Sequence, residues 1–181
     1  MKSGEETGMS KQARNSMAAI MTVLVTIVMW MTAIIGLIFL ASVGAAIIAH
    51  QNGGSLDTLN ISVTDGTESL PALIAGLVGG LVAIPAIIYV CIQLRRILAT
   101  LAEGDPFVPQ NASRLTRVAA TIAITQFLRI AVALVILMNF DNTTVGLNLD
   151  LIAWASVAAL FILSQVFREG TRLRDEEKMT I

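Results

Sequence analysis

The residues best suited to binding or catalysis are polar side chains that lie inside long apolar runs. Arg129 interrupts one run, with Thr125 and Gln126 about one turn before it, and Gln93 stands near the end of another. A charged side chain at mid-membrane costs about 2.5–3.5 kcal/mol on insertion scales, so Arg129 should face the interior of a helix bundle or a water-filled cavity. We therefore predict an intramembrane polar site formed by Arg129, Gln126, Thr125 and Gln93. It acts either as a site for a polar ligand or signal, or as an internal hydrogen-bond clasp.

The residue types and motifs of the sequence do not favour an enzyme. Acid–base catalysis needs a positioned His or carboxylate, and the four apolar runs, with the fourth counted from Leu151, contain no Asp, Glu or His. One histidine, His50, and one cysteine, Cys91, are too few for a zinc site. No Gly-rich phosphate loop or nucleophile motif is present. We predict no catalytic residue, no cofactor and no metal, and hence a protein that is not an enzyme.

The composition indicates a membrane protein. The 181 residues are 55% hydrophobic and only 14% charged, whereas soluble domains carry about 25% charged residues. The 12 Lys and Arg nearly balance the 13 Asp and Glu, so no basic excess suggests direct nucleic-acid binding. The single cysteine cannot form an internal disulfide.

Four apolar runs are long enough to act as membrane spans, which need about 20 residues. The first far exceeds the apolar core of about 7 to 15 residues in a cleaved signal peptide, so we expect it to be retained. The predicted spans cover about residues 17–49, 70–94, 118–138 and 149–166. Residues 1–16 are predicted to be a flexible N-terminal tail, 17–166 the transmembrane domain, and 167–181 a C-terminal tail. The predicted fold is an all-α membrane protein with four transmembrane helices in two hairpins.

Positive charge sets the expected orientation. Eleven of the twelve Lys and Arg residues fall in the two termini and the central loop, and none falls in the other two loops. Cationic flanks are retained on the cytosolic side, so both termini are expected in the cytosol, in a multi-pass protein of the inner (plasma) membrane. Sequons at Asn60 and Asn142 should then be extracytoplasmic and the one at Asn111 cytosolic.

The central loop, residues 94–117, is predicted to be a structured corner. Apolar residues at helical spacing continue past Arg95 and Arg96, so the second helix should project beyond the membrane. Gly104 is suited to end it, and Pro109 to begin the next helix. The C-terminal tail can prolong the fourth helix, with Arg172 and Glu176 paired at four residues.

The corner and tail together form a candidate cytosolic interaction face. Apolar residues there lie outside the hydrocarbon, where exposed clusters often mark interaction sites. Alternatively, these residues pack on one another, and the tail arginines reach anionic lipid. The predicted face consists of Gly104, Asp105, Pro106, Phe107, Arg168, Arg172 and Arg174.

Small residues predict close helix packing. Gly36 and Gly44 lie in the first span, and Gly76 and Gly80 in the second, with Gly79 beside them. Such residues let helix backbones approach one another. Pro85 should kink or loosen the second helix, because its ring removes one backbone hydrogen bond. Whether the protein forms a homo-oligomer is left open.

Two charged regions, the central loop and the C-terminal tail, carry a resemblance to a known family. The matching residues within them are Leu94–Leu98, Gly104–Phe107, Asn111, Arg114–Leu115, Val166–Gly170, Leu173–Glu176 and Thr180–Ile181. In these the chain resembles an uncharacterised bacterial family of four-helix membrane proteins, described as a domain of unknown function. The resemblance implies no catalytic residues. Members are often encoded beside a small helix-turn-helix regulator, which implies a role in membrane-linked gene control.

Two functions remain after these exclusions. A regulatory or scaffolding membrane partner of a cytosolic regulator needs only a stable helix assembly and a structured cytosolic face, and this is the favoured prediction. The alternative is a small transporter or channel subunit in which Arg129 lines a polar path, because small residues, Pro85 and a buried charge are features of transport paths. No acidic coupling residue lies in any span when the fourth is counted from Leu151, which counts against transport.

Overall fold

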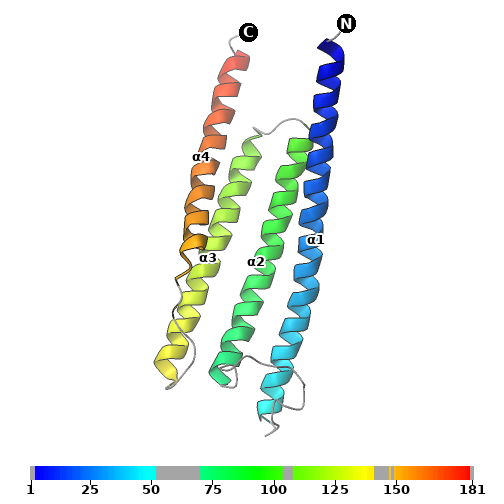
Figure 1. Ribbon diagram of the computed structural model, residues 1–181. Helices are drawn as coiled ribbons and strands as arrows, with labels where there is room; N and C mark the ends of the chain where they lie inside the picture. The colour runs from blue at the N-terminus through cyan, green and yellow to red at the C-terminus, as the bar shows by residue number, and fades with distance from the viewer. Residues whose placement is uncertain (1–2, 52–69, 104–107, 141–146, 148, 180–181) are drawn as a thin grey trace.

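All the regular secondary structure in the described part of the chain is α-helix. The computed structural model describes residues 3–51, 70–103, 108–140, 147 and 149–179, drawn in colour in Figure 1. Its helices are α1 (Ser3–Gln51), α2 (Leu70–Ala102), α3 (Pro109–Asn139) and α4 (Leu151–Met179). The predicted all-α fold with four long helices is confirmed.

The helices form an open row in chain order. Helix α1 packs on α2, α2 on α3, and α3 on α4, and within the described residues no other pair of helices is in contact. The row is visible in Figure 1, where α1 and α4 are the outer helices. The two predicted hairpins, α1–α2 and α3–α4, are therefore present and joined through α2 and α3. The expected bundle interior is not, because α1 and α4 do not meet.

Each helix contains an apolar stretch long enough to cross a membrane. These stretches are Met17–Ala49, Pro71–Ala102, Pro109–Asn139 and Leu151–Glu176. Large apolar side chains on them are exposed in the isolated chain, such as Trp30 at 62%. Since lipid covers such side chains in a bilayer, the exposure agrees with a multi-pass membrane protein.

Several helix ends differ from the predicted spans. Residues 3–16, predicted to be a flexible tail, are the first turns of α1; no proline occurs among them to break the helix. Helix α2 continues past its predicted span to Ala102, and α3 begins at Pro109, as expected for a structured corner. Gly104, the predicted helix stop, lies outside the described residues.

Helix α4 starts later and ends later than its predicted span. It begins at Leu151, because the Asp150 carboxylate accepts a hydrogen bond from the Ala153 N–H at 3.0 Å and so caps the first turn. It continues to Met179, so most of the predicted tail is helical. The expected pair between Arg172 and Glu176 is present at 3.5 Å.

Helices α1 and α2 pack through two glycines. A Cβ added to Gly36 would lie 2.8 Å from Ile84, and one added to Gly80 would lie 2.9 Å from Phe39. At these two positions only glycine allows the observed approach, as predicted. Gly44 and Gly79 face open space instead, and Pro85 lies within a continuous α2.

Candidate functional site

The corner between α2 and α3 is held together by a buried asparagine. The Asn111 side chain is fully buried and donates from Nδ2 to the Thr100 hydroxyl at 2.7 Å. Its Oδ1 accepts a hydrogen bond from Arg114 Nη1 at 2.9 Å, and the same guanidinium nitrogen donates to the Arg96 carbonyl at 2.9 Å. These contacts tie the first turns of α3 to the last turns of α2.

The start of α3 places this asparagine. Val108 has extended backbone angles (φ −75°, ψ 132°) and precedes Pro109 at the first helical position, where proline's missing N–H is not needed. The Asn111 N–H donates to the Val108 carbonyl at 2.9 Å. The polypeptide thus enters the helix in a defined turn, which presents Asn111 to α2. We call the end of the helix row that holds this turn the corner side.

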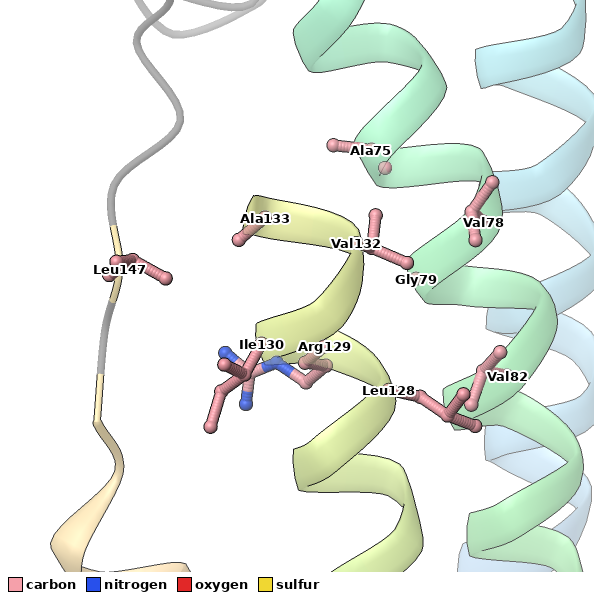
Figure 2. Close-up of a pocket in the computed structure, with 11 residues that line it drawn as sticks. Ala75, Val78, Gly79, Val82, Leu128, Arg129, Ile130, Val132, Ala133 and Leu147 are labelled. Carbon is pink, nitrogen blue, oxygen red and sulfur yellow. The ribbon is translucent and has the colours of Figure 1, made fainter. Parts of the chain in front are cut away.

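Arg129 lies on α3 far from the corner side. Its guanidinium donates to Gln126 Oε1 at 3.2 Å, and in the described residues it makes no ion pair. Figure 2 shows the side chain extending from α3 toward the side on which Leu147 lies. Because the helices form a row and not a closed bundle, Arg129 is exposed on the isolated chain. Of the two environments expected for Arg129, the described helices form no closed bundle interior, whereas Arg129 does line two cavities and makes its predicted contact with Gln126.

Two cavities between α2 and α3 meet at Arg129. The first has a volume of about 300 Å³ and is lined by residues of α2 and α3 together with Leu147 (Figure 2). The second, of about 500 Å³, includes Thr121, Thr125 and Gln126 of α3. Both are also lined by Gly76 and Gly79. The structure therefore gathers three of the four predicted polar residues at one cavity: Thr125, Gln126 and Arg129.

Thr125 takes part only as a cavity wall. Its hydroxyl donates to the Thr121 carbonyl at 2.8 Å, one turn back along the same helix. The hydroxyl hydrogen is therefore committed to the backbone of α3. The hydroxyl oxygen can still accept a hydrogen bond, whereas Arg129 offers free donors to an occupant of the cavity.

Gln93 does not join this site. The Asn111–Thr100 and Arg114–Arg96 contacts set a register between antiparallel helices that brings Gln93 level with about Arg117, roughly 18 Å along α3 from Arg129. Its side chain is 1% exposed, its Nε2 donates to the Tyr89 hydroxyl at 2.7 Å, and its Oε1 has no hydrogen-bond partner. Turning the amide over exchanges the two atoms and still leaves one without a partner.

The second predicted site, the interaction face, is described in part. Gly104, Asp105, Pro106 and Phe107 lie outside the described residues. Arg168 and Arg172 line a groove between α4 and the start of α3, with a volume of about 450 Å³. The same groove is lined by Pro109, Ala112, Ser113, Thr171 and Asp175. Arg174 is not among its lining residues.

The charged side chains of α4 differ in their pairing. Arg172 contacts Glu169 at 2.6 Å and Glu176 at 3.5 Å. Arg168 is exposed and has no ion pair with any described residue. Of the two groove arginines, Arg168 is thus the one whose charge the described protein does not balance.

The network around Asn111 was missed by reasoning from sequence, although one signal for it exists. Asn111 follows the start of α3 by two residues, and Thr100 precedes the end of α2 by two. Polar residues placed symmetrically about a predicted corner can meet across it. The prediction treated Asn111 only as a sequon and as part of the family resemblance.

Comparisons with known proteins give a family but no activity. In the described residues, no group of three or more His, Cys, Asp or Glu could hold a metal ion. No curated protein and no solved structure matches the chain. A family model described as "Protein of unknown function (DUF2975)" matches residues 61–181, which include α2, α3 and α4. The chain belongs to the DUF2975 family.

Proposed function

We propose that this multi-pass membrane protein is a regulatory partner, not an enzyme, and that it holds a cytosolic regulator protein at the membrane. The groove between α3 and α4 is the observation that carries the proposal. It lies at the corner side, which we expect in the cytosol because Lys and Arg are concentrated there. The membrane would be the inner (plasma) membrane.

The groove has the chemistry of a protein contact site. Apolar Pro109 and Ala112 lie beside polar and charged groups of α4, which is the mixed character of a transient interface. The unpaired guanidinium of Arg168 would be complemented by a carboxylate of the partner. Asp175 would accept a hydrogen bond or an ion pair from it.

The proposed partner is the small helix-turn-helix regulator that the family resemblance leads us to expect. Such a protein would bind DNA when released and be silenced when held at the membrane. This membrane protein would not itself contact nucleic acid. The groove residues lie at the corner-side ends of α3 and α4, outside the spans predicted at 118–138 and 149–166, so the interaction can be tested without altering the middle of either helix.

Fractionation of the neighbouring regulator tests the proposal. With the wild-type membrane protein, we expect the regulator in the membrane fraction. Arg168→Glu should release it, because the substitution opposes the charge presented to the partner. Arg95→Glu is the matched control. Arg95 is also exposed near the corner side of the helix row, but it is not among the groove-lining residues. A regulator that stays soluble beside wild-type protein, or stays bound to Arg168→Glu, would contradict the proposal.

A small transporter or channel subunit is the second candidate. It is favoured by the cavities that meet at Arg129, since transport paths use charged residues facing polar cavities. Solute or ion flux in proteoliposomes that is abolished by Arg129→Leu would support it. Absence of flux across a panel of anions and cations would count against it.

A further inference from the structure

Helix α4 is too short to cross the membrane beside α3 along its whole length. Its uncharged part, residues 151–167, is about 26 Å long, whereas α3 extends about 33 Å from Arg117 to Asn139. The hydrocarbon core of a bilayer is about 30 Å thick. Part of the core beside α3 is therefore not filled by α4.

The register between α3 and α4 shows where α4 falls short. The rings of Phe127 and Trp154 pack edge to face with their centroids 5.0 Å apart, so the two residues lie at about the same depth. Measured from there toward Asn139, Arg129 lies about 3 Å further and Asp150 about 6 Å further. Helix α3 continues for about another 12 Å beyond the depth of Asp150. Figure 1 shows the same relation, with α4 beginning part-way along α3.

The described residues just before α4 are not helical at this depth. Leu147, Leu149 and Asp150 lie outside any helix, and all three are exposed. Leu147 lines a cavity with Arg129 and Ala133, and Figure 2 shows it alongside α3 between those two residues. Non-helical backbone at membrane depth is tolerated only where it is buried in protein or lines a water-filled cavity. Because these residues are exposed, we infer the second situation.

Two opposite charges lie at this depth without an ion pair. Arg129 and Asp150 are both exposed, and neither forms a salt bridge with another described residue. The Asp150 carboxylate caps the Ala153 N–H, and Arg129 donates to the neutral Gln126. The Arg129 side chain extends away from α2, toward the side on which Leu147 lies (Figure 2). Charged side chains within membrane spans face a protein interior or a water-filled cavity, and the described helices enclose no interior.

We propose that a water-filled recess opens at the end of the helix row opposite the corner side and extends inward to Arg129 and Asp150. The cavity of about 300 Å³ lined by Arg129, Ala133 and Leu147 is its inner part. In the predicted orientation the recess opens to the extracytoplasmic side. Small hydrophilic molecules from that side thereby reach a cation and an anion near the middle of the membrane. This inference does not depend on the regulator proposed above.

Cysteine labelling of the full-length protein in spheroplasts tests the recess. In a Cys91→Ala background, Leu147→Cys is treated with the membrane-impermeant anion sulfonatoethyl methanethiosulfonate. Leu81→Cys is the matched control, because Leu81 is 54% exposed against 52% for Leu147 and lines neither cavity beside Arg129. The register between α2 and α3 places Leu81 level with about Arg129. We expect Leu147→Cys to react at least about tenfold faster, because the reactive thiolate forms in water and not in lipid.

A cationic reagent of the same type tests the two charges. The rate with trimethylammonioethyl methanethiosulfonate is measured at Leu147→Cys, and the ratio of the anionic to the cationic rate is compared between variants. Arg129→Gln should lower this ratio about five- to tenfold, and Asp150→Asn should raise it by a similar factor, as expected for one unit charge at about 7 Å in water. Asparagine also caps helices, so Asp150→Asn keeps the start of α4. A purely structural role of either residue would change both rates together and leave the ratio constant.

Three results would overturn the proposal. They are no reaction of Leu147→Cys under conditions in which Asn139→Cys, at the end of α3, reacts; equal rates for Leu147→Cys and Leu81→Cys; and a rate ratio that neither charge variant changes. Size-exclusion elution of each variant confirms folding. If Arg129→Gln does not fold, Asp150→Asn alone decides the charge test, and an unchanged ratio in it contradicts the recess.

Discussion

The Asn111 side chain donates a 2.7 Å hydrogen bond to the Thr100 hydroxyl and thereby joins the start of α3 to the end of α2. The Thr100 hydroxyl in turn donates to the Ile97 carbonyl at 2.7 Å. The contact continues through Arg114 to the Arg96 carbonyl. A buried asparagine satisfied in this way fixes the start of α3 against the end of α2.

Breaking this network should destabilise the protein. Asn111→Ala removes a fully buried side chain and leaves Arg114 without its side-chain acceptor, so we expect a loss of about 1–3 kcal/mol. Thr100→Val removes the other partner. Because the two residues are in contact, the double variant should lose less than the sum of the single losses. Thermal unfolding in detergent measures this cycle, and strict additivity would show that the contact contributes nothing.

Glycosylation at Asn111 should fail on either side of the membrane. The acceptor nitrogen, Nδ2, is buried and already bonded to Thr100. An unmodified Asn111 in microsomes therefore does not show that this residue is cytosolic. Its sequon, which we predicted to be cytosolic, is not a usable topology marker. Modification of this residue would contradict the buried geometry. The sequons at Asn60 and Asn142 lie outside the described residues.

Orientation is better tested with introduced cysteines. In a Cys91→Ala background, Glu103→Cys lies beside the end of α2 and Asn139→Cys at the end of α3, both at exposed positions. We expect a membrane-impermeant maleimide added to intact spheroplasts to label Asn139→Cys only, and Glu103→Cys to react after the membrane is opened. The opposite pattern would reverse the predicted orientation.

Gly36 and Gly44, both on α1, should differ in how well they tolerate replacement by alanine. A Cβ at Gly36 would lie within 2.9 Å of three atoms of Ile84, whereas one at Gly44 meets nothing within 4 Å. Gly36→Ala should therefore cost about 1–3 kcal/mol through overpacking. Gly44→Ala should be neutral or stabilising, because alanine favours the helix by up to about 1 kcal/mol. Melting temperatures of the two variants decide this, and a similar fall in both would contradict the observed packing.

Gln93 should be replaceable without loss of stability. One atom of its buried amide has no partner, and a buried unsatisfied polar atom costs about 1–3 kcal/mol. Gln93→Met keeps a similar volume and removes that cost, while Tyr89, which is 39% exposed, can exchange its hydrogen bond with Gln93 for one with water or a lipid headgroup. We expect an equal or higher melting temperature. A clear fall would show that Gln93 has a partner outside the described residues.

Hydropathy and charge predicted the helices well but not their lateral order. Four spans, the projection of α2 beyond Arg96 and the extension of α4 follow from apolar length and helical spacing. The open row could not be predicted in this way. In a membrane, the helix surface that faces lipid and the surface that faces another helix are both apolar, so hydropathy does not distinguish them. For the same reason Arg129 was assigned to a bundle interior. Gln93 was grouped with it because the register between α2 and α3 depends on the corner at Asn111.

The row of helices also bears on how the protein is made. Among the described residues, every contact between helices joins neighbours in sequence, so each can form as soon as the second helix of the pair leaves the translocon. No early helix has to wait for a distant one to cover it, and no contact has to be undone when α4 arrives. Biogenesis can therefore proceed from α1 to α4 in the order of translation, with each hairpin assembled before the next begins.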